Sequence, residues 1–253
     1  MKPIWAVQTN LNLHTASLFD TACTKNGNEF IPFFSRAFSD EIPDNIPTDN
    51  VLIYGSTRLV SLLEKSKKYK PGIISITDNY LKKWDKDFLL NEDNVIMDIS
   101  KVSLSKNESL FIRPQGDNKE FDGAVYTKDE FQKIKNVIPT NLTVLVSSVK
   151  EIQNEWRLFL VNGKVSTGSH YRYGGKEVCA WHEYSPTAVF IAEQLCKTYL
   201  PAEIFVMDVC LTKEGDYKIV ECNGFNSCGF YEASVDKFVK DVNTYYEKMG
   251  LLG

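Results

Sequence analysis

The sequence is poor in histidine, and its cysteines lack the spacing of metal or disulfide pairs. Three histidines are scattered along the chain, and none of the six cysteines belongs to a Cys-x-x-Cys pair. Zinc sites and disulfide frameworks usually show such spacings, so neither is indicated. Several cysteines stand inside apolar runs, which suits reduced thiols buried as small hydrophobic groups.

Long apolar runs and an excess of positive charge are also missing. No apolar run approaches about 18 residues, the length of a membrane span, and the N-terminus lacks the apolar core of a signal peptide. The net charge of −4 argues against a general nucleic-acid binder or a protein of anionic membranes. We therefore expect a cytoplasmic protein that binds neither nucleic acid nor membranes. The sequence leaves open whether the protein forms a homodimer.

The overall amino-acid composition is typical of a globular protein. Hydrophobic residues make up 43% and charged residues 25% of 253 residues. These proportions are ordinary for a folded domain, and the length allows one large or two modest domains.

An acidic hairpin is predicted near the C-terminus, over residues 203–223. Two runs rich in β-branched and aromatic residues flank Lys-Glu-Gly-Asp, which is typical of two antiparallel strands joined by a tight turn. With Glu214 and Gly215 at the centre of the turn, Asp208 faces Glu221. The hairpin therefore places two carboxylates side by side.

Two facing carboxylates repel each other unless something neutralises them. Asn223 lies two residues beyond Glu221 and therefore on the same face of the strand. Three oxygen ligands on one face fit a hard divalent cation. The alternative is a solvated edge with a coincidental acidic pair, although Asp208 and Glu221 each interrupt a strongly apolar run.

The N-terminal part reads as a small α/β unit. Strands are expected at residues 3–7, 50–57 and 71–76, with an amphipathic helix at 58–68, and one or two helices are expected within 77–108. The Gly55-Ser56 turn, between a strand and a helix, has two interpretations: a plain turn, or a site for a phosphate or carboxylate on free backbone N–H groups.

Residues 110–126 predict a strand ending at Arg113, a polar loop and a second strand beginning at Gly123. Arg113 and Lys119 supply one rigid and one flexible cation, which suits a nucleotide's phosphates. A plain hairpin with surface cations explains the same residues. A short helix at 128–136 and a buried strand at 143–149 follow.

The strongest turn signal is Asn162-Gly163, between alternating strands at 155–161 and 164–172. Pairing around it predicts that Glu155 opposes His170 and that Arg157 opposes Gly168, which would leave room for a ligand. Tyr171 is assigned to the core face. The opposite face, which a solvated surface explains equally well, carries Glu155, Arg157, His170 and Arg172. Helices are expected at 186–199 and 234–248.

Three motifs, in this order, resemble the ATP-grasp superfamily, specifically a bacterial and phage clade marked by two arginines and a lysine. They are Phe-Ile-Arg-Pro-x-x-Asp-x-Lys-x-Phe-x-Gly at 111–123, Glu-Trp-Arg-Leu-Phe-x-x-x-Gly-Lys-Val-x-x-Gly-Ser-x-Tyr-Arg at 155–172, and Val-x-Asp-Val with Ile-Val-Glu-Cys-Asn-x-Phe-Asn-Ser-x-Gly-Phe-Tyr within 206–231. The resemblance implies an α+β ATP-grasp fold, in which two α+β lobes grip ATP. We expect that domain at residues 101–253, after a small α/β pre-ATP-grasp domain at 1–100 that helps to hold the acceptor.

The resemblance also implies roles for single residues, with ATP and Mg²⁺ as cofactors. Three side chains would act in catalysis: Arg157, Arg172 and Lys119. The nucleotide would contact Arg113, Lys119, Val146, Ser147, Ser148, Val149, Glu155 and Arg157. The hinge at 146–149 lacks the acidic residue that often holds the ribose, so Glu155 is expected to replace it. The metal would lie on Asp208, Glu221 and Asn223, while Cys222 between them packs on the other face. The acceptor candidates are Asn226, Ser227 and Tyr231.

The chemistry implied by the resemblance is carboxylate activation. ATP would phosphorylate a carboxylate, and an amine would attack the acylphosphate to give an amide, ADP and phosphate. The partners would be the carboxylate of a small molecule, peptide or protein end, and an amine. Two alternatives stay open: a kinase of the same fold, and a nucleotide-binding module without catalysis.

Overall fold

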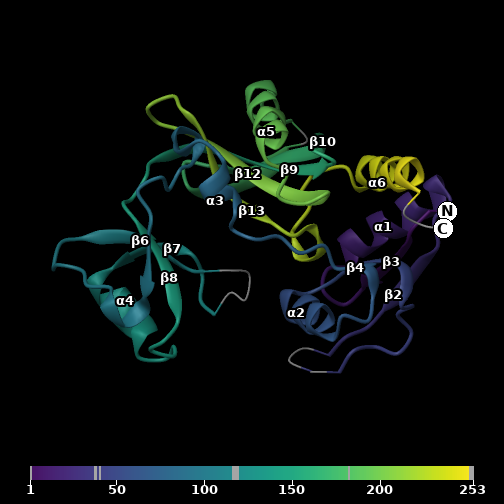
Figure 1. Cartoon of the computed structure of the whole chain (residues 1–253), viewed down its shortest axis with the longest axis horizontal. Helices are drawn as coiled ribbons and strands as arrows, with labels where there is room; N and C mark the ends of the chain where they lie inside the picture. The colour runs from purple at the N-terminus through teal and green to yellow at the C-terminus, as the bar shows by residue number, and fades with distance from the viewer. Residues whose placement is uncertain (1, 37–38, 40, 116–119, 182, 251–253) are drawn as a thin grey trace.

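The computed structural model describes residues 2–36, 39, 41–115, 120–181 and 183–250. Its N-terminal unit is a parallel sheet in the order β2-β1-β3-β4 (Figure 1). Leu59 and Leu63 of one helix pack under this sheet. The strands and helices of the unit are β1 (Ile4–Gln8), α1 (Leu13–Asn26), β2 (Phe30–Phe33), β3 (Asp49–Tyr54), α2 (Thr57–Ser66) and β4 (Lys70–Gly72).

A small lobe follows, built on an antiparallel sheet in the order β5-β8-β6-β7. Its own core forms around Phe131, which is buried among the apolar residues of the sheet. The connection and the lobe contain α3 (Tyr80–Lys83), η1 (Lys86–Phe88), β5 (Val95–Asp98), η2 (Ile99–Lys101), β6 (Ser109–Pro114), β7 (Ala124–Thr127), α4 (Lys128–Lys135) and β8 (Thr143–Ser147).

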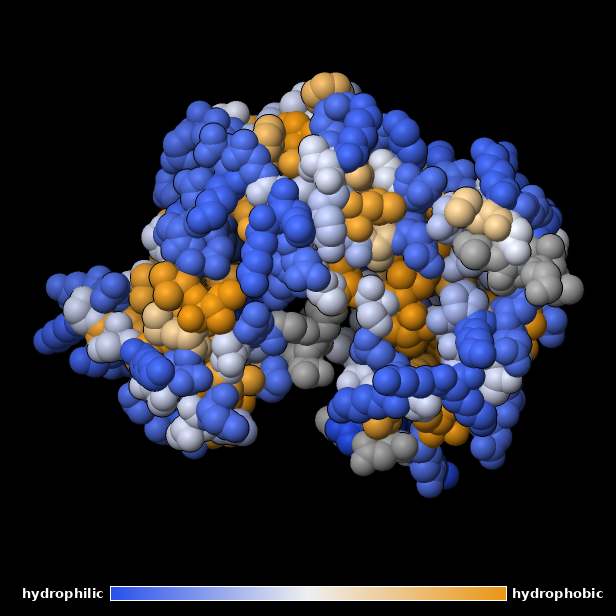
Figure 2. All heavy atoms as spheres, in the orientation of Figure 1, coloured by the Kyte–Doolittle hydropathy of each residue, from blue (hydrophilic) through white to orange (hydrophobic). Residues whose placement is uncertain are grey.

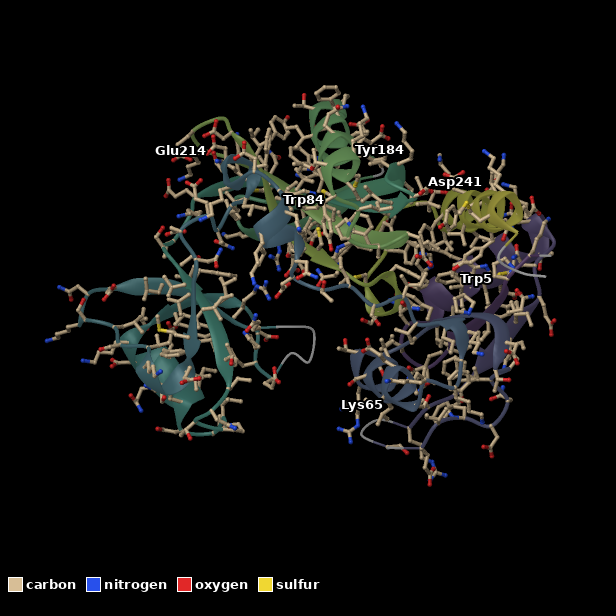
Figure 3. The ribbon with its side chains drawn as sticks, in the orientation of Figure 1. Trp5, Lys65, Trp84, Tyr184, Glu214 and Asp241 are labelled. Carbon is tan, nitrogen blue, oxygen red and sulfur yellow. The ribbon has the colours of Figure 1, made fainter. Side chains whose placement is uncertain are left out.

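The central sheet has five antiparallel strands in the order β11-β10-β9-β12-β13. One of its faces packs on α5 and on Trp84, which reaches up from the end of α3 and donates its indole N–H to the carbonyl of Tyr199 (Figure 3). The elements are β9 (Ile152–Val161), β10 (Lys164–Tyr173), β11 (Lys176–Trp181), α5 (Pro186–Thr198), β12 (Ile204–Thr212), β13 (Tyr217–Asn223), η3 (Phe225–Ser227) and α6 (Val235–Met249).

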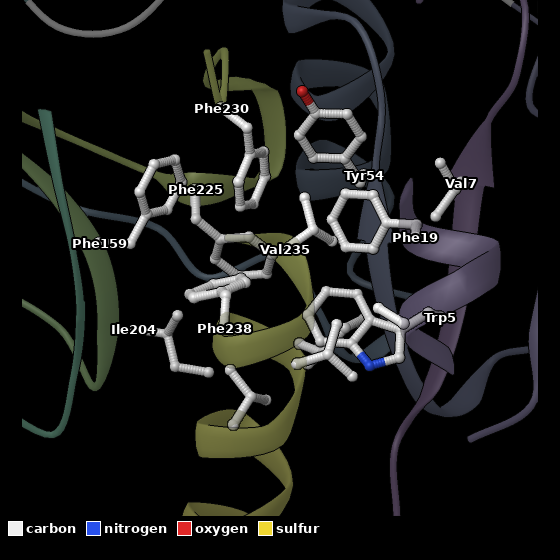
Figure 4. Close-up of a cluster of buried hydrophobic side chains, with 14 of the residues drawn as sticks. Trp5, Val7, Phe19, Tyr54, Phe159, Ile204, Phe225, Phe230, Val235 and Phe238 are labelled. Atoms are coloured by element: carbon white, nitrogen blue, oxygen red, sulfur yellow. The ribbon is translucent and has the colours of Figure 1, made fainter. Parts of the chain in front are cut away.

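An aromatic core joins the N-terminal unit to the central sheet (Figure 4). Phe230 stacks on Phe159 of β9 with ring centroids 4.2 Å apart, and its edge or face also meets Phe19, Tyr54 and Phe238. These rings come from β9, α1, β3 and α6. The chain therefore returns at its C-terminal end to close the core of its first unit.

The small lobe and the N-terminal unit hang from the same side of the central sheet and leave a hollow between them (Figures 1 and 2). Polar surface borders most of this hollow, with apolar groups on its inner walls (Figure 2). No helix among the described residues is long and apolar enough to cross a membrane. The five cysteines whose side chains are described are buried thiols, as the sequence predicts.

Most predicted strands and helices of the C-terminal half are present, but the region at 77–108 differs. It was expected to form one or two helices and instead contains the four-residue α3, two 3₁₀ turns and β5. β5 pairs with β8, so tertiary pairing overrides the helical pattern. The division at residue 100 stays a prediction, and β5 lies just before it. The expectations also missed α1, β2 and β11.

In the acidic hairpin Asp208 lies opposite Glu221 as predicted, but a bulge between residues 208 and 209 shifts the pairs nearer the turn, such as Val209 with Ile219, by one residue from the predicted register. The Asn162-Gly163 hairpin is also present, and both turn residues have positive φ. Its predicted register is wrong because β10 contains bulges between residues 165 and 167 and between 170 and 172. Glu155 consequently faces Arg172, and His170 faces Trp156.

We predict that Phe230→Ala lowers the free energy of unfolding by about 3–5 kcal/mol, because it opens a cavity at the junction of four elements. Urea unfolding followed by circular dichroism measures this change. Phe190→Ala is the matched control, since the Phe190 side chain on α5 is 63% exposed and should change stability by less than about 0.5 kcal/mol. Equal effects of the two substitutions would contradict the structural role of Phe230.

Candidate active site

One cleft of about 620 Å³ lies between the central sheet, the small lobe and the loop after β13. Besides the acceptor candidates Ser227 and Tyr231, it brings together seven of the predicted catalytic, nucleotide-binding and metal-binding residues, from four strands of the central sheet and from β6. They are Arg113, Glu155, Arg157, Arg172, Asp208, Glu221 and Asn223. Lys119, also predicted to act here, lies outside the described residues.

The centre of the cleft is a buried ion pair between Arg157 of β9 and Asp208 of β12. The guanidinium donates through Nε to Asp208 Oδ1 at 2.9 Å and through Nη2 to Oδ2 at 2.7 Å. The two residues face each other across the strands. Burial by itself favours a neutral guanidine, but the carboxylate of Asp208 holds the pKa of Arg157 well above its ordinary value. The guanidinium of Arg157 therefore stays charged.

Glu221 lies opposite Asp208 and accepts a hydrogen bond from the Asn223 amide at 2.8 Å. Among the described residues no group of three His, Cys, Asp or Glu side chains forms a metal site; the set at this position has two carboxylates and one amide. The Asn223 amide gives its nitrogen to Glu221, which leaves its oxygen available. Each carboxylate oxygen has a second lone pair, so the bond to Arg157 leaves Asp208 able to bind a cation.

The charges of the cleft also favour a cation. Its described lining has two more negative than positive groups: three arginines, Arg113, Arg157 and Arg172, stand against five acids, Asp78, Asp122, Glu155, Asp208 and Glu221. Hard oxygen donors and excess negative charge are the conditions that Mg²⁺ requires. The residues therefore fit the metal that the sequence implies.

Tyr171 is a site residue that the sequence assigned to the wrong face. Its hydroxyl donates to Glu155 Oε2 at 2.8 Å and lies 3.3 Å from Asp208 Oδ2. Burial, with the negative charges of Asp208 and Glu155, raises the pKa of Tyr171 well above its usual value, so the hydroxyl keeps its proton. The bulges of β10 bring Tyr171 to the charged face, and no pattern in the sequence marks a bulge.

Two aromatic rings pack beside the Arg157 guanidinium. Tyr171 and Tyr231 stack with centroids 4.9 Å apart, and the Arg157 guanidinium lies 5.2 Å and 5.4 Å from their rings. Tyr231 has a φ of 52°, a conformation that a residue of this size adopts only under constraint. Such strain gathers at functional sites, and here it places the ring beside the guanidinium.

Arg113, at the end of β6, faces the cleft from the small lobe. It lies 3.6 Å from Asp78 of the segment between β4 and α3, and both side chains are largely buried. Asp78 was not among the predicted site residues, because only helices without a functional site were expected in that segment. This ion pair connects the small lobe to the linker that carries it.

A second cavity of about 520 Å³ adjoins the cleft, and Glu155 and Arg172 line both. Ser148 of the predicted hinge lies in its wall, while Val146, Ser147 and Val149 lie outside that lining. The backbone N–H of Ser148 donates a hydrogen bond to the Asp93 carboxylate at 2.9 Å, and the Lys150 ammonium donates to the same carboxylate.

The structure also decides three smaller points: the Gly55-Ser56 turn, the space at Gly168 and the role of Asn226. Gly55 and Ser56 cannot bind an anion through their N–H groups, which donate to Asn226 O and Gln8 Oε1. Gly168 leaves no room for a ligand, since a Cβ there would meet Leu158 and Tyr184.

Asn226, an acceptor candidate, is instead structural. Its buried side chain donates to the carbonyls of Ile53 and Gly72 and accepts from the N–H of Ile74. It thereby fastens η3 to the N-terminal sheet. Cys222 packs on the opposite face of β13, as expected.

Residues 93–241 match the model of the ATP-grasp domain, R2K clade family 2. The chain belongs to this family. Comparison with curated proteins gives no match. The predicted ATP-grasp fold is confirmed, since solved ATP-grasp structures align over nearly the whole chain.

Three of these structures illustrate the similarity. D-cycloserine synthetase DcsG is 10% identical with a TM-score of 0.63, over 95% of this chain and 99% of that one. An ATP-grasp RimK domain protein from Sphaerobacter thermophilus DSM 20745 is 13% identical with a TM-score of 0.62, over 96% and 98%. D-alanine–D-alanine ligase from Bacillus anthracis complexed with ATP is 11% identical with a TM-score of 0.57, over 98% of each chain.

We predict that Glu155 makes stability depend on pH. Burial raises the pKa of its carboxyl, although the Tyr171 hydroxyl and Arg172 oppose the shift. A carboxyl whose pKa is raised in the folded state favours folding at pH values below its ordinary pKa of 4.5. This contribution to stability is lost as the pH rises through the raised pKa. The unfolding free energy of the wild type, relative to Glu155→Gln, should therefore fall between pH 5 and pH 8.

Urea unfolding at both pH values measures this difference. Glu151→Gln is the matched control, because Glu151 is an exposed glutamate just before β9. A difference between wild type and Glu155→Gln that stays constant or grows with pH would show that burial does not govern this carboxyl.

Proposed function

We propose that this protein is an ATP- and Mg²⁺-dependent ligase that joins a carboxylate to an amine through an acylphosphate and forms ADP. The observation that carries the proposal is the single cleft in which the facing carboxylates Asp208 and Glu221 meet three arginines. The substrate would be an amino acid, a peptide or a protein end. The names of two structures of similar fold, D-cycloserine synthetase and D-alanine–D-alanine ligase, support the reaction class.

The nucleotide would lie across the two adjoining cavities. Its base would occupy the cavity beside Ser148, where residues 146–149 form the hinge. Glu155, at the junction of the cavities, would meet the ribose. The phosphates would then enter the cleft toward Arg113, and Lys119 would close over them from the loop after β6.

Asp208, Glu221 and Asn223 would hold Mg²⁺, with both carboxylates and the amide oxygen as ligands. When bound, the metal would neutralise phosphate oxygens and hold them in position for transfer. Tyr171 and Tyr231 keep the Arg157 guanidinium from turning away, so Arg157 presents a fixed positive charge. A fixed charge stabilises the transferring phosphoryl group without reorganising during the reaction.

The proposed chemistry has two steps. A substrate carboxylate oxygen bonds to the γ-phosphorus while the bond to the β–γ bridging oxygen breaks, and ADP leaves. The amine nitrogen then attacks the acyl carbon, phosphate departs with the C–O bond electrons, and the nitrogen loses its proton. Arg172, half-exposed beside Glu155, would balance the charge on the carboxylate or on the departing phosphate.

The decisive test is ADP release from ATP and Mg²⁺ with pooled amino acids and short peptides, with and without hydroxylamine. Hydroxylamine converts an acylphosphate to a hydroxamate, so carboxylate activation is detected before the natural amine is identified. We expect pool-dependent ADP release together with hydroxamate. Pool-dependent ADP without hydroxamate would contradict the ligase and favour a kinase.

We predict that Glu221→Gln abolishes Mg²⁺-dependent ADP release and leaves the fold intact, because the Glu221 side chain is partly exposed and its hydrogen bond is to the neighbouring Asn223 on the same strand. Circular dichroism checks the fold. Glu214→Gln at the tip of the same hairpin (Figure 3) is the control and should retain full activity. Full activity of Glu221→Gln would remove this carboxylate from the metal site.

Asp208→Asn should abolish turnover as well, but with a loss of stability. It leaves the buried Arg157 without its carboxylate, which costs about 3–5 kcal/mol. Glu221→Gln is therefore the cleaner of the two tests.

A further inference from the structure

A side pocket of about 260 Å³ opens beside the cleft, between the N-terminal unit and the loop after β13. The two cavities share the wall formed by Asn223, Ser227 and Cys228. A molecule in this side pocket would therefore lie next to the proposed metal ligands. The two proposed reaction steps give this side pocket no role.

Helix α2 presents a row of polar side chains to the side pocket. Thr57, Ser61 and Glu64 are spaced four and three residues apart, so they lie on one side of the helix and line the cavity. The apolar residues Leu59 and Leu63 face the core of the N-terminal unit instead. Core packing therefore does not account for this row, and neither does the helix cap, which is made by Ser56.

The side pocket is negative. Glu64 is the one charged residue in its lining, all of which lies in the described part of the chain. Glu64 stands in the last turn of α2, where the helix macrodipole has its negative end and adds to the charge of the carboxylate. The Ser75 hydroxyl donates to Glu64 and fixes its position across the pocket.

We propose that the side pocket binds the amine substrate in its ammonium form, with Glu64 as the specificity-determining residue. The ammonium group would lose one proton to solvent before its nitrogen attacks the acyl carbon, because a protonated nitrogen has no lone pair. This inference rests on the proposed ligase function and deepens it. A carboxylate substrate would be repelled by Glu64, whereas the cleft offers it arginines. The volume lies just below the range of about 300–1,000 Å³ typical of drug-sized ligands, so the pocket suits a small amine of amino-acid size and not a protein end.

Binding can be tested without any chemistry. Glycinamide is a suitable probe, because it is small, carries an ammonium group and has no carboxylate. We expect glycinamide to bind the wild type in an NMR titration without ATP, and Glu64→Gln to weaken it at least about tenfold, since a charged hydrogen bond is lost. Ser61→Leu, which fills the pocket, should abolish binding. Glu29→Gln, an exposed glutamate of the same unit, should change nothing.

A kinetic arm separates this inference from the ligase proposal. Hydroxylamine is uncharged at pH 8 and replaces the amine, so hydroxamate formation by the wild type tests the ligase without the ammonium group that the side pocket would bind. Two results would overturn the side-pocket inference while supporting the ligase. In both, the wild type forms hydroxamate, but glycinamide either does not bind or binds the wild type and Glu64→Gln with equal affinity. Glu64-dependent binding without hydroxamate would support the pocket and overturn the ligase.

Discussion

The buried pair of Arg157 and Asp208 is the interaction on which the candidate site depends. Two opposed carboxylates, Asp208 and Glu221, face each other across β12 and β13, and a guanidinium bound through two nitrogens offsets their repulsion. A buried pair of this kind needs good geometry to repay the desolvation of both charges. Tyr171 and Tyr231 supply it by packing on the guanidinium, so the site is ordered before any ligand arrives.

The three parts of the molecule are joined unequally. The aromatic core around Phe230 and the hydrogen bonds of Asn226 bind the N-terminal unit tightly to the central sheet. The small lobe has a separate core and meets the rest through polar links, such as Asp93 with Lys150 and Asp78 with Arg113. The proposed metal ligands and the side pocket therefore belong to the parts that share a core, while Arg113 comes from the lobe with a core of its own.

The sequence predicted the fold class and which charged residues gather in the candidate cleft, and its errors have two physical origins. Pairing by alternation placed Asp208 opposite Glu221 correctly because two displacements cancel: the pairs next to the turn are one residue out of the predicted register, and the bulge between Asp208 and Val209 restores it. It failed between β9 and β10 because an earlier bulge shifts every later residue, which moved Tyr171 onto the charged face. Asp78, Asn226 and the side pocket arise from contacts between distant segments, and no local pattern encodes them.

Charge gives an order to the proposed reaction. The described cleft has two more acidic than basic groups, so a nucleotide polyanion is repelled unless a divalent cation enters with it. Metal and nucleotide would then act as one ligand, and their binding would free the arginines to face the substrate carboxylate. The side pocket is negative for a different reason, the carboxylate of Glu64 at the end of α2. Two substrates of opposite charge would thus be directed to neighbouring cavities that meet beside Asn223, where the bond has to form.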